Sequence, residues 1–377
     1  MPAYPTYKLG EVIDKVTIVF KVKQKEYLAD GKFPIIDQGQ NLIGGYTNDE
    51  KLLVNTEFPV IVFGDHTKVK KYIDFPFVAG ADGTKIIKPK KEFFSEPKLF
   101  YYFLHCLKLP DKGYARHFQY LLKSDISIPP LATQQAIVTR IEALFAELDK
   151  GVEKLKTAQQ QLKTYRQAVL NDLLNNGNDE WKIVKLADIC ITVSDGDHLP
   201  PKRTTCGVPF ITISDIKNNA IDFSNVSYMT EEYYNSLSDS RKAQKGDLLY
   251  TVTGSFGIPV LIDSDTKFCF QRHIGLIRPN PNCVSQKWLY YMMQSPIIYS
   301  QATEKATGTA QKTVTLTVLR NFNFPLSPLP TQQRIVKEIE TRLEAAEAVE
   351  KNIAEALQQA EALRQSILKK AFDGELV

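Results

Sequence analysis

The stretch that decides the fold is PPLATQQAIV at residues 129–138, because the chain repeats it as PLPTQQRIV at residues 328–336. Thr133 and Thr331 stand 198 positions apart, and the correspondence continues at that offset, without a gap, for about forty residues. Identical residues at this offset include Gln134 with Gln332, Ile141 with Ile339, Arg166 with Arg364 and Leu170 with Leu368. Internal repetition constrains architecture before any other signal. The chain therefore alternates two globular segments with two related helical segments.

Each copy of the repeat predicts the start of a long helix. Prolines close the preceding segments, and Thr133 and Thr331 suit the N-cap position, where a hydroxyl oxygen accepts from a free backbone N–H of the first turn. No proline follows until well beyond each helix. A helix of about forty residues would be roughly 60 Å long at 1.5 Å per residue.

Apolar residues recur every seven positions in both predicted helices over five heptads, a spacing typical of a coiled-coil-like pair. Gly151 and Arg342 interrupt this pattern. The residues expected to pack the two helices together are Ile137, Ile141, Leu144, Leu148, Leu155, Leu162, Val169, Ile335, Ile339, Val349, Ile353, Leu363 and Ile367.

Connectivity favours pairing of the two helices within one chain. The second globular segment begins where the first helix ends and finishes where the second helix starts. An antiparallel pair brings these two ends together, whereas a parallel pair would force the segment to bridge the whole length of the helices. The alternative is that each helix pairs with a helix of another chain.

The two globular segments also resemble each other. YKLGEVID near the N-terminus corresponds to WKIVKLADIC at 181–190, and KLFYYFLHCL at 98–107 corresponds to KWLYYMMQSP at 287–296. Short runs of Val, Ile, Phe and Thr between Gly, Asp and Asn predict strands. We therefore expect an α+β chain with two similar α/β domains, each with a curved or barrel-like sheet, separated by two long antiparallel helices that form an intramolecular coiled coil with pseudo-two-fold symmetry. The expected boundaries are 1–130 for the first domain, 131–178 for the first helix, 179–327 for the second domain and 328–377 for the second helix.

Composition limits the classes of protein to consider. A chain of 377 residues with 43% hydrophobic residues is long enough for two or three packed domains. The apolar runs are too short to span a membrane, and the N-terminus lacks the pattern of a signal peptide, so we expect a cytoplasmic protein. Five cysteines without CxxC spacing are interpreted as reduced, mostly buried thiols.

No motif indicates catalysis. The chain lacks a Walker A loop, a GxGxxG motif and the Asn/Asp-Pro-Pro-aromatic tetrapeptide of amino-methyltransferases. DGDH at 195–198 offers two carboxylates and an imidazole, but no partner cluster follows at metal-ligand spacing, so we interpret it as a turn. We therefore expect neither catalytic nor metal-binding residues.

Positive charge gathers in the first segment. Residues 1–130 hold 19 Lys and Arg against 15 Asp and Glu, and the basic residues cluster as KVKQK at 21–25, KVKK at 68–71 and KPKK at 88–91. Such clusters are often plain solvated surface, and they indicate phosphate binding only alongside a second reason to expect nucleic acid.

That second reason is a resemblance. Two variable domains that alternate with two repeated long helices, each preceded by a proline-containing motif, resemble the specificity subunit of type I restriction–modification systems. The resemblance covers the whole chain. Its most specific parts are PPLATQQAIVTRIEALF, SPLPTQQRIVKEIETRLEAAE and, at 308–330, GTAQKTVTLTVLRNFNFPLSPLP, which is similar to the end of a target-recognition domain.

The resemblance implies a non-catalytic, sequence-specific DNA-binding subunit. It would recognise a bipartite, asymmetric site on double-stranded DNA and dock two modification subunits, which methylate adenine at N6, together with restriction subunits that translocate and cut DNA. The chain itself would bind no cofactor, because S-adenosylmethionine, ATP and Mg would be held by these partner subunits.

In this role, base edges in the major groove would be read by polar loop residues, while Lys and Arg would fix the position on phosphates. The candidates in the first domain are Lys21, Lys23, Lys25, Gln38, Gln40, Asn41, His66, Lys68, Lys70, Arg116, His117 and Gln119. The candidates in the second domain are His198, Lys202, Arg203, Ser214, Asn218, Ser255, Gln271, Arg272, His273, Thr309, Gln311 and Lys312.

Two other functions stay open on the sequence alone. An interaction scaffold whose two domains bind protein would lack salt-sensitive binding to duplex DNA. A free-standing nuclease or methyltransferase would show turnover by the isolated chain.

Overall fold

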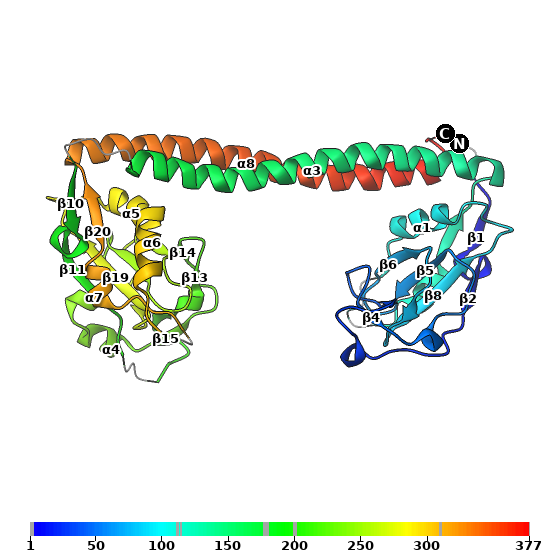
Figure 1. Cartoon of the computed structure of the whole chain (residues 1–377), viewed down its shortest axis with the longest axis horizontal. Helices are drawn as coiled ribbons and strands as arrows, with labels where there is room; N and C mark the ends of the chain where they lie inside the picture. The colour runs from blue at the N-terminus through cyan, green and yellow to red at the C-terminus, as the bar shows by residue number, and fades with distance from the viewer. Residues whose placement is uncertain are drawn as a thin grey trace. The chain divides into compact units, whose positions relative to one another are not determined.

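The computed structural model describes residues 4–110, 113, 115–175, 181–198, 202–308 and 311–376. The chain divides into two compact units, the first made of Met1–Lys156 with Ala354–Val377 and the second of Thr157–Ile353. Two long helices, α3 (Leu131–Asn175) and α8 (Leu329–Phe372), each contribute one part to each unit (Figure 1). Each unit therefore consists of one globular domain and a short stretch of paired helix.

The domain of the first unit contains three sheets, in the strand orders β2-β8-β5-β6, β4-β3-β7 and β1-β9. Its elements are β1 (Thr6–Lys8), β2 (Ile13–Val16), β3 (Phe33–Ile36), β4 (Gly45–Thr47), β5 (Val60–Gly64), β6 (Lys70–Ile73), β7 (Val78–Ala79), β8 (Thr84–Pro89), α1 (Pro97–Cys106), α2 (Phe118–Lys123) and β9 (Asp125–Ser127), with 3-10 turns at Leu9–Glu11, Gln24–Glu26 and Glu50–Leu52.

The domain of the second unit repeats this plan, with sheets in the orders β11-β19-β16-β17, β15-β12-β18 and β10-β20, and adds a β13-β14 hairpin. Its elements are β10 (Lys182–Lys185), β11 (Cys190–Asp195), β12 (Val208–Ile211), β13 (Ile216–Lys217), β14 (Ala220–Ile221), β15 (Ser227–Met229), α4 (Glu231–Ser236), β16 (Leu248–Thr251), β17 (Pro259–Leu261), β18 (Cys269–Phe270), β19 (Ile274–Pro279), α5 (Gln286–Gln294), α6 (Pro296–Lys305), α7 (Leu316–Arg320) and β20 (Asn323–Leu326), with 3-10 turns at Leu186–Ile189, Ile213–Asp215 and Asp239–Arg241.

The central strand of each four-stranded sheet is apolar on both faces because both faces are covered. In β5, Ile61 and Phe63 pack with Phe100 of α1, while Val60 and Val62 pack with residues of β3 and β7 on the other face. Successive side chains of a strand point to opposite faces, so a continuous apolar run is what such a position requires. β16 occupies the same place in the second unit, between α5 and the β12–β18 pair.

The prediction of two similar α+β domains is confirmed by the shared strand order. Neither four-stranded sheet closes into a barrel within the described residues: β2 and β6 are edges of one sheet, and β11 and β17 are edges of the other. Each sheet stays open because a second, three-stranded sheet covers its face and completes the core.

The helices α3 and α8 are antiparallel in both units. In the first unit, Ile137 and Ile141 near the start of α3 share a cluster with Ile367 near the end of α8. In the second unit, Leu174 at the end of α3 shares a cluster with Ile339 near the start of α8. The helix pair therefore forms within a single chain, as the connectivity predicts.

The apolar seams of the helices differ in how well they are buried. Most of the residues expected to pack the two helices together are buried near the domains. Val349 and Leu363, which were also expected to pack between the helices, are instead 46% and 51% exposed. Two turns of an α-helix hold 7.2 residues rather than seven. Of two neighbouring rows of residues spaced by seven, one therefore turns away from the partner helix. Arg342, which interrupted the pattern, forms ion pairs with Asp172 on α3 (3.7 Å) and Glu338 (2.7 Å).

The repeated phrase itself is explained by one buried side chain. Gln134 is fully buried; its amide oxygen accepts from the backbone N–H of Ser95 at 2.9 Å, and its amide nitrogen donates to the carbonyls of Phe93 (2.8 Å) and Pro129 (3.0 Å). Gln332 does the same in the second unit, accepting from Ser285 (2.8 Å) and donating to the carbonyls of Ser327 (2.8 Å) and Cys283 (3.2 Å). We call this arrangement the glutamine clamp: it joins the loop before α1 or α5 to the start of the long helix.

The predicted N-cap role of Thr133 is wrong. α3 begins at Leu131, and the Thr133 hydroxyl donates to the carbonyl of Pro130 at 2.8 Å instead of accepting a backbone N–H. α8 likewise begins at Leu329, two residues before Thr331 and with Pro330 in its first turn. Proline is favoured there because its missing N–H would have no helical partner.

Replacing Gln134 by Ala should lower the free energy of unfolding by about 2–4 kcal/mol, because the Ser95 N–H and the carbonyls of Phe93 and Pro129 lose their buried partner. The exposed neighbour provides the matched control: Gln135→Ala should cost less than about 0.5 kcal/mol. Urea unfolding followed by circular dichroism measures both. Equal small losses for the two variants would show that the clamp does not stabilise the fold.

Candidate nucleic-acid interface

In the first unit, the residue that follows β5 joins three distant segments. The Asp65 N–H donates to the carbonyl of Gly83 (2.7 Å), and the Asp65 carbonyl accepts from the N–H of His117 (2.8 Å). Asp65 is only 4% exposed, and its carboxylate accepts from the N–H of Phe118 at 2.8 Å. The segments 64–69, 80–83 and 115–118 therefore meet in one place, which we call the first loop cluster.

Hydrogen-bonding side chains gather at the first loop cluster. The amide oxygen of Gln38 accepts from the backbone N–H of His66 at 3.2 Å, and the Nδ1 atom of His66 lies 3.2 Å from the carbonyl oxygen of Ala115. The Thr67 hydroxyl donates to the Gln38 carbonyl at 2.7 Å. An amide and an imidazole held in place by the backbone are suited to reading the edges of bases.

Two ammonium groups lie beside them. Lys21 donates to the carbonyl of Thr84 at 3.2 Å, and the Lys85 nitrogen is 3.9 Å from the Asp65 carboxylate. Partial burial and, next, the nearby charge of Lys85 lower the pKa of Lys21. Two neighbouring ammonium groups make the local electrostatic potential more positive, and this favours binding of an anion such as a phosphate.

The second unit has the same backbone arrangement with different side chains. Val252 takes the place of Asp65: its N–H donates to the carbonyl of His273 (3.0 Å), and its carbonyl accepts from the N–H of Val314 (2.8 Å). The segments 252–258, 271–273 and 311–314 form the second loop cluster. The backbone scaffold is therefore shared, while the side chains on it are not.

The second loop cluster carries an arginine and two histidines. The Nε atom of Arg272 lies 3.3 Å from the His273 ring, and the ring of His198 lies 2.8 Å from the Asp195 carboxylate. Burial, then the charge of Arg272 and then His198, lower the pKa of His273. His273 is therefore neutral at neutral pH, so its ring can both donate and accept a hydrogen bond.

The structure brings together part of the candidate list from the first domain. His66, Lys68 and Arg116 lie in the first loop cluster, and Lys21 and Gln38 contact it. Gln40 and Asn41 lie on the adjoining 37–44 loop, and Lys70 begins β6. Lys23 and Lys25 lie on or beside the 3-10 turn Gln24–Glu26, and Gln119 is exposed on α2.

His117 does not fit the role that we expected. It is fully buried, and its Nε2 atom lies 3.3 Å from the carbonyl oxygen of Gly113. A side chain without access to solvent cannot reach a base edge, so the structure contradicts His117 as a DNA contact. It serves the fold instead, through the bond from its N–H to Asp65.

In the second domain, the candidates in or next to the second loop cluster are His198, Ser255, Gln271, Arg272, His273, Gln311 and Lys312. Lys202 is exposed, the Arg203 guanidinium stacks on the ring of Phe210, and the Ser214 hydroxyl bonds to that of Thr212. Thr309 lies outside the described residues. Asn218 lines a cleft beside the long helices, away from where we expected it.

Sequence reasoning missed two charged residues at these sites. Lys85 is the second residue of β8, beside the first loop cluster, and Arg241 lies 3.7 Å from Asp195 and 3.6 Å from Asp197 near the second. The signal for Lys85 was its position two residues after Gly83 of the Asp82–Gly83 turn. Arg241 sits about forty residues from its partners, and no local pattern indicates such a contact.

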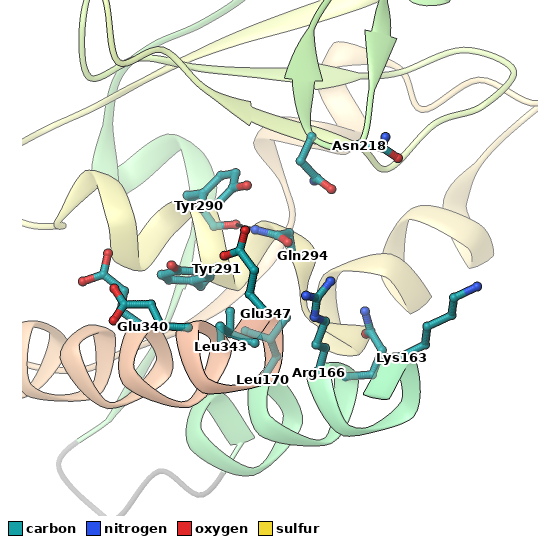
Figure 2. Close-up of a pocket in the computed structure, with 13 residues that line it drawn as sticks. Lys163, Arg166, Leu170, Asn218, Tyr290, Tyr291, Gln294, Glu340, Leu343 and Glu347 are labelled. Carbon is teal, nitrogen blue, oxygen red and sulfur yellow. Dashed lines mark hydrogen bonds between the residues drawn. The ribbon is translucent and has the colours of Figure 1, made fainter. Parts of the chain in front are cut away.

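A second kind of surface lies where the domain meets the long helices. In the second unit, a cleft of about 630 Å³ separates α5 from α3 and α8. Figure 2 shows Tyr290 and Tyr291 of α5 on one side of it. The helices contribute Arg166, Leu170, Glu340, Leu343 and Glu347 to the cleft.

The first unit has a matching cleft of about 500 Å³. Tyr101 and Tyr102 of α1 take the place of the tyrosine pair, and Arg364 and Leu368 stand at the repeat offset from Arg166 and Leu170. Glu142 likewise corresponds to Glu340, and each accepts from a lysine of the domain helix, Lys98 at 2.7 Å and Lys287 at 2.5 Å. The two clefts are therefore equivalent, in contrast to the two loop clusters.

The described residues contain no group of three or more His, Cys, Asp and Glu side chains that could hold a metal ion. Within the same residues, no helix is both long and apolar enough to cross a membrane.

Comparison with known proteins agrees with the fold. A family described as "Type I restriction modification DNA specificity domain" matches residues 3–157 and 178–359. The specificity subunit of the type I restriction enzyme EcoBI from Escherichia coli is 27% identical over 277 residues, which are 67% of this chain and 58% of that protein. The EcoR124I/EcoR124II specificity subunit from Escherichia coli is 26% identical over 336 residues, which are 84% of this chain and 81% of that protein.

Solved structures give the same result for the fold. A chain from a study of complex assembly and conformational transition of the type I R-M system superposes with a TM-score of 0.74 at 20% identity, covering 100% of this chain and 99% of that one. The HsdS subunit from Thermoanaerobacter tengcongensis superposes with a TM-score of 0.55 at 19% identity, covering 100% and 98%. On its repeated helices, its two like domains and these matches, the chain belongs to the type I restriction–modification DNA specificity family, whose members are specificity subunits.

Proposed function

We propose that the chain recognises a bipartite, asymmetric site on double-stranded DNA, with one loop cluster reading each half. The observation that carries this proposal is the contrast between the clusters. Their backbone hydrogen bonds correspond, whereas the first presents Lys21, Gln38 and His66 and the second presents Arg272 and His273. A common scaffold with different exposed groups suits two readers of two different sequences.

The same proposal assigns the chemistry to partner subunits. Two modification subunits would bind S-adenosylmethionine and methylate adenine at N6, and restriction subunits would use ATP and Mg to translocate and cut DNA. Because the substrate is cellular DNA, the complex would work in the cytoplasm. The chain would supply recognition and position.

The two clefts are the surfaces that we assign to the modification subunits. A partner present in two copies needs two equivalent docking sites, and the clefts share a tyrosine pair, an arginine, a leucine and a lysine–glutamate pair. Tyrosine and arginine are enriched where proteins bind each other. Both clefts lie against α3 and α8.

Duplex binding should weaken steeply with salt, because each neutralised phosphate releases counterions. For about six phosphate contacts, the affinity of the full chain should fall on the order of a thousandfold between 50 and 200 mM salt. Lys21→Gln and Lys85→Gln should each lower the slope of log affinity against log salt by about one, whereas Lys8→Gln on β1 should not. Binding that does not depend on salt would favour the interaction scaffold.

Variants of the two clusters should affect different halves of the site. Gln38→Ala should relax base preference in one half, and Arg272→Lys should relax it in the other, each by roughly 5- to 150-fold, since Lys keeps the charge but loses the planar fork that binds guanine. Sequencing methylated adenines in cells that express the chain with its modification subunits measures this. Relaxation of the same half by both variants would contradict the assignment.

Filling one cleft should remove one modification subunit. Ala146 and Glu344 are exposed and line the first and second clefts, so Ala146→Trp and Glu344→Trp should each give complexes with one modification subunit instead of two. Glu355→Trp, exposed on α8 outside both clefts, is the matched control and should retain two. Native mass spectrometry counts the subunits, and a normal complex with both blocking substitutions present would disprove docking at the clefts.

A further inference from the structure

The loop between β3 and β4, residues 37–44, supplies Gln38 to the first loop cluster and also carries Gln40 and Asn41. Its sequence, DQGQNLIG, contains two glycines and few large apolar groups to pack. A loop of this composition needs other contacts to hold one shape. Those contacts come from a buried lysine.

Lys71 lies in the middle of β6, and its side chain is only 4% exposed. Its ammonium group donates to the carbonyls of Asn41 (2.5 Å) and Leu42 (3.4 Å) and lies 3.6 Å from the Asp37 carboxylate. One cation therefore ties the first residue of the loop to its middle. Burial lowers the pKa of Lys71, while Asp37 counteracts this by favouring the charged form.

The Asp37 carboxylate is fixed from several sides. It accepts from the N–H of Gly39 at 2.8 Å and from the Tyr27 hydroxyl at 3.2 Å. A Cβ atom on Gly44, at the other end of the loop, would lie only 2.8 Å from a carboxylate oxygen. The loop thus closes tightly around Asp37, with no room for a side chain at its end.

The fold alone does not require this ion pair. Lys71 pairs with Val62 across the sheet, as Val260 pairs with Leu249 in the second unit, so Val260 takes the place of Lys71. The corresponding loop of the second unit is held by the β13–β14 hairpin and by Asn219, which donates to the carbonyl of Pro259 at 2.9 Å. A buried charge costs several kcal/mol unless it is paired, and the sister domain does without it.

We propose that Asp37 and Lys71 are positioning residues for the first half of the DNA site: they set the shape of the 37–44 loop and so determine which bases Gln38 and its neighbours accept. This inference rests on the proposed function and adds residues that would not touch DNA themselves. The two halves of the site then depend on different anchors, an ion pair in the first domain and a β-hairpin with the Asn219 hydrogen bond in the second.

The test uses the full chain expressed with its modification subunits, and adenine methylation across the genome as the readout. Lys71→Met should lower the preference for the first half-site over single-base mismatches by about tenfold, because the loop would no longer hold Gln38 in position for its base contact. Preference at the second half-site should not change. Asp37→Asn, which keeps the shape but removes the charge, should act in the same direction.

A matched control separates positioning from general loss of stability. Ile73 lies two residues further along β6, on the same buried face, and packs in the core. Ile73→Ala should lower thermal stability at least as much as Lys71→Met and yet leave the first half-site preference intact. Should Lys71→Met fail to fold, Tyr27→Phe removes only the hydroxyl that holds Asp37 and should relax the same half-site by a smaller factor.

Unchanged discrimination in folded Lys71→Met, or equal relaxation by Ile73→Ala, would overturn the inference. Equal relaxation of both half-sites would overturn it as well. If the unaltered chain directs no methylation to a bipartite site, the proposed function fails instead, so the two failures are distinguishable.

Discussion

The buried amides of Gln134 and Gln332 are the constraint on which the rest of the structure depends. Each amide forms hydrogen bonds with one backbone N–H and two backbone carbonyls. These bonds join a domain to the start of a long helix. An amide is suited to this because it accepts and donates at adjacent positions, which neither a carboxylate nor an ammonium can do. The helix cannot then change its direction relative to its own domain without leaving buried polar groups unpaired.

The two units share some structural features and differ in others. The strand orders, the backbone bonds of the loop clusters and the clefts beside the long helices correspond between the units. The side chains on the loops and the means of holding them do not, as Lys71 and Val260 illustrate. Recognition can therefore change through loop residues while core packing and the clefts stay the same.

Much of this was predictable from the sequence, and the reasons for the rest are physical. The repeat at a fixed offset predicts the helices, because helical periodicity is local to the sequence. The order of the segments along the chain then predicts how the helices pair. The glutamine clamp was not predicted, since two of its three partners in each unit lie about 40–50 residues away along the chain. His117 was misjudged because exposure depends on the tertiary fold, and its polar side chain gives no sign of burial. The basic run at 68–71 was interpreted as a possible surface cluster, yet strand alternation turns Lys71 inward.

The equivalence of the two clefts has a consequence for how such a complex would evolve. If one and the same partner segment occupies both, a substitution in that segment acts twice for each assembled complex. A tenfold loss of affinity at a single cleft, about 1.4 kcal/mol, becomes a hundredfold loss in forming the complete assembly. A substitution in the partner therefore changes the free energy of assembly twice, whereas a substitution in one cleft of this chain changes it only once.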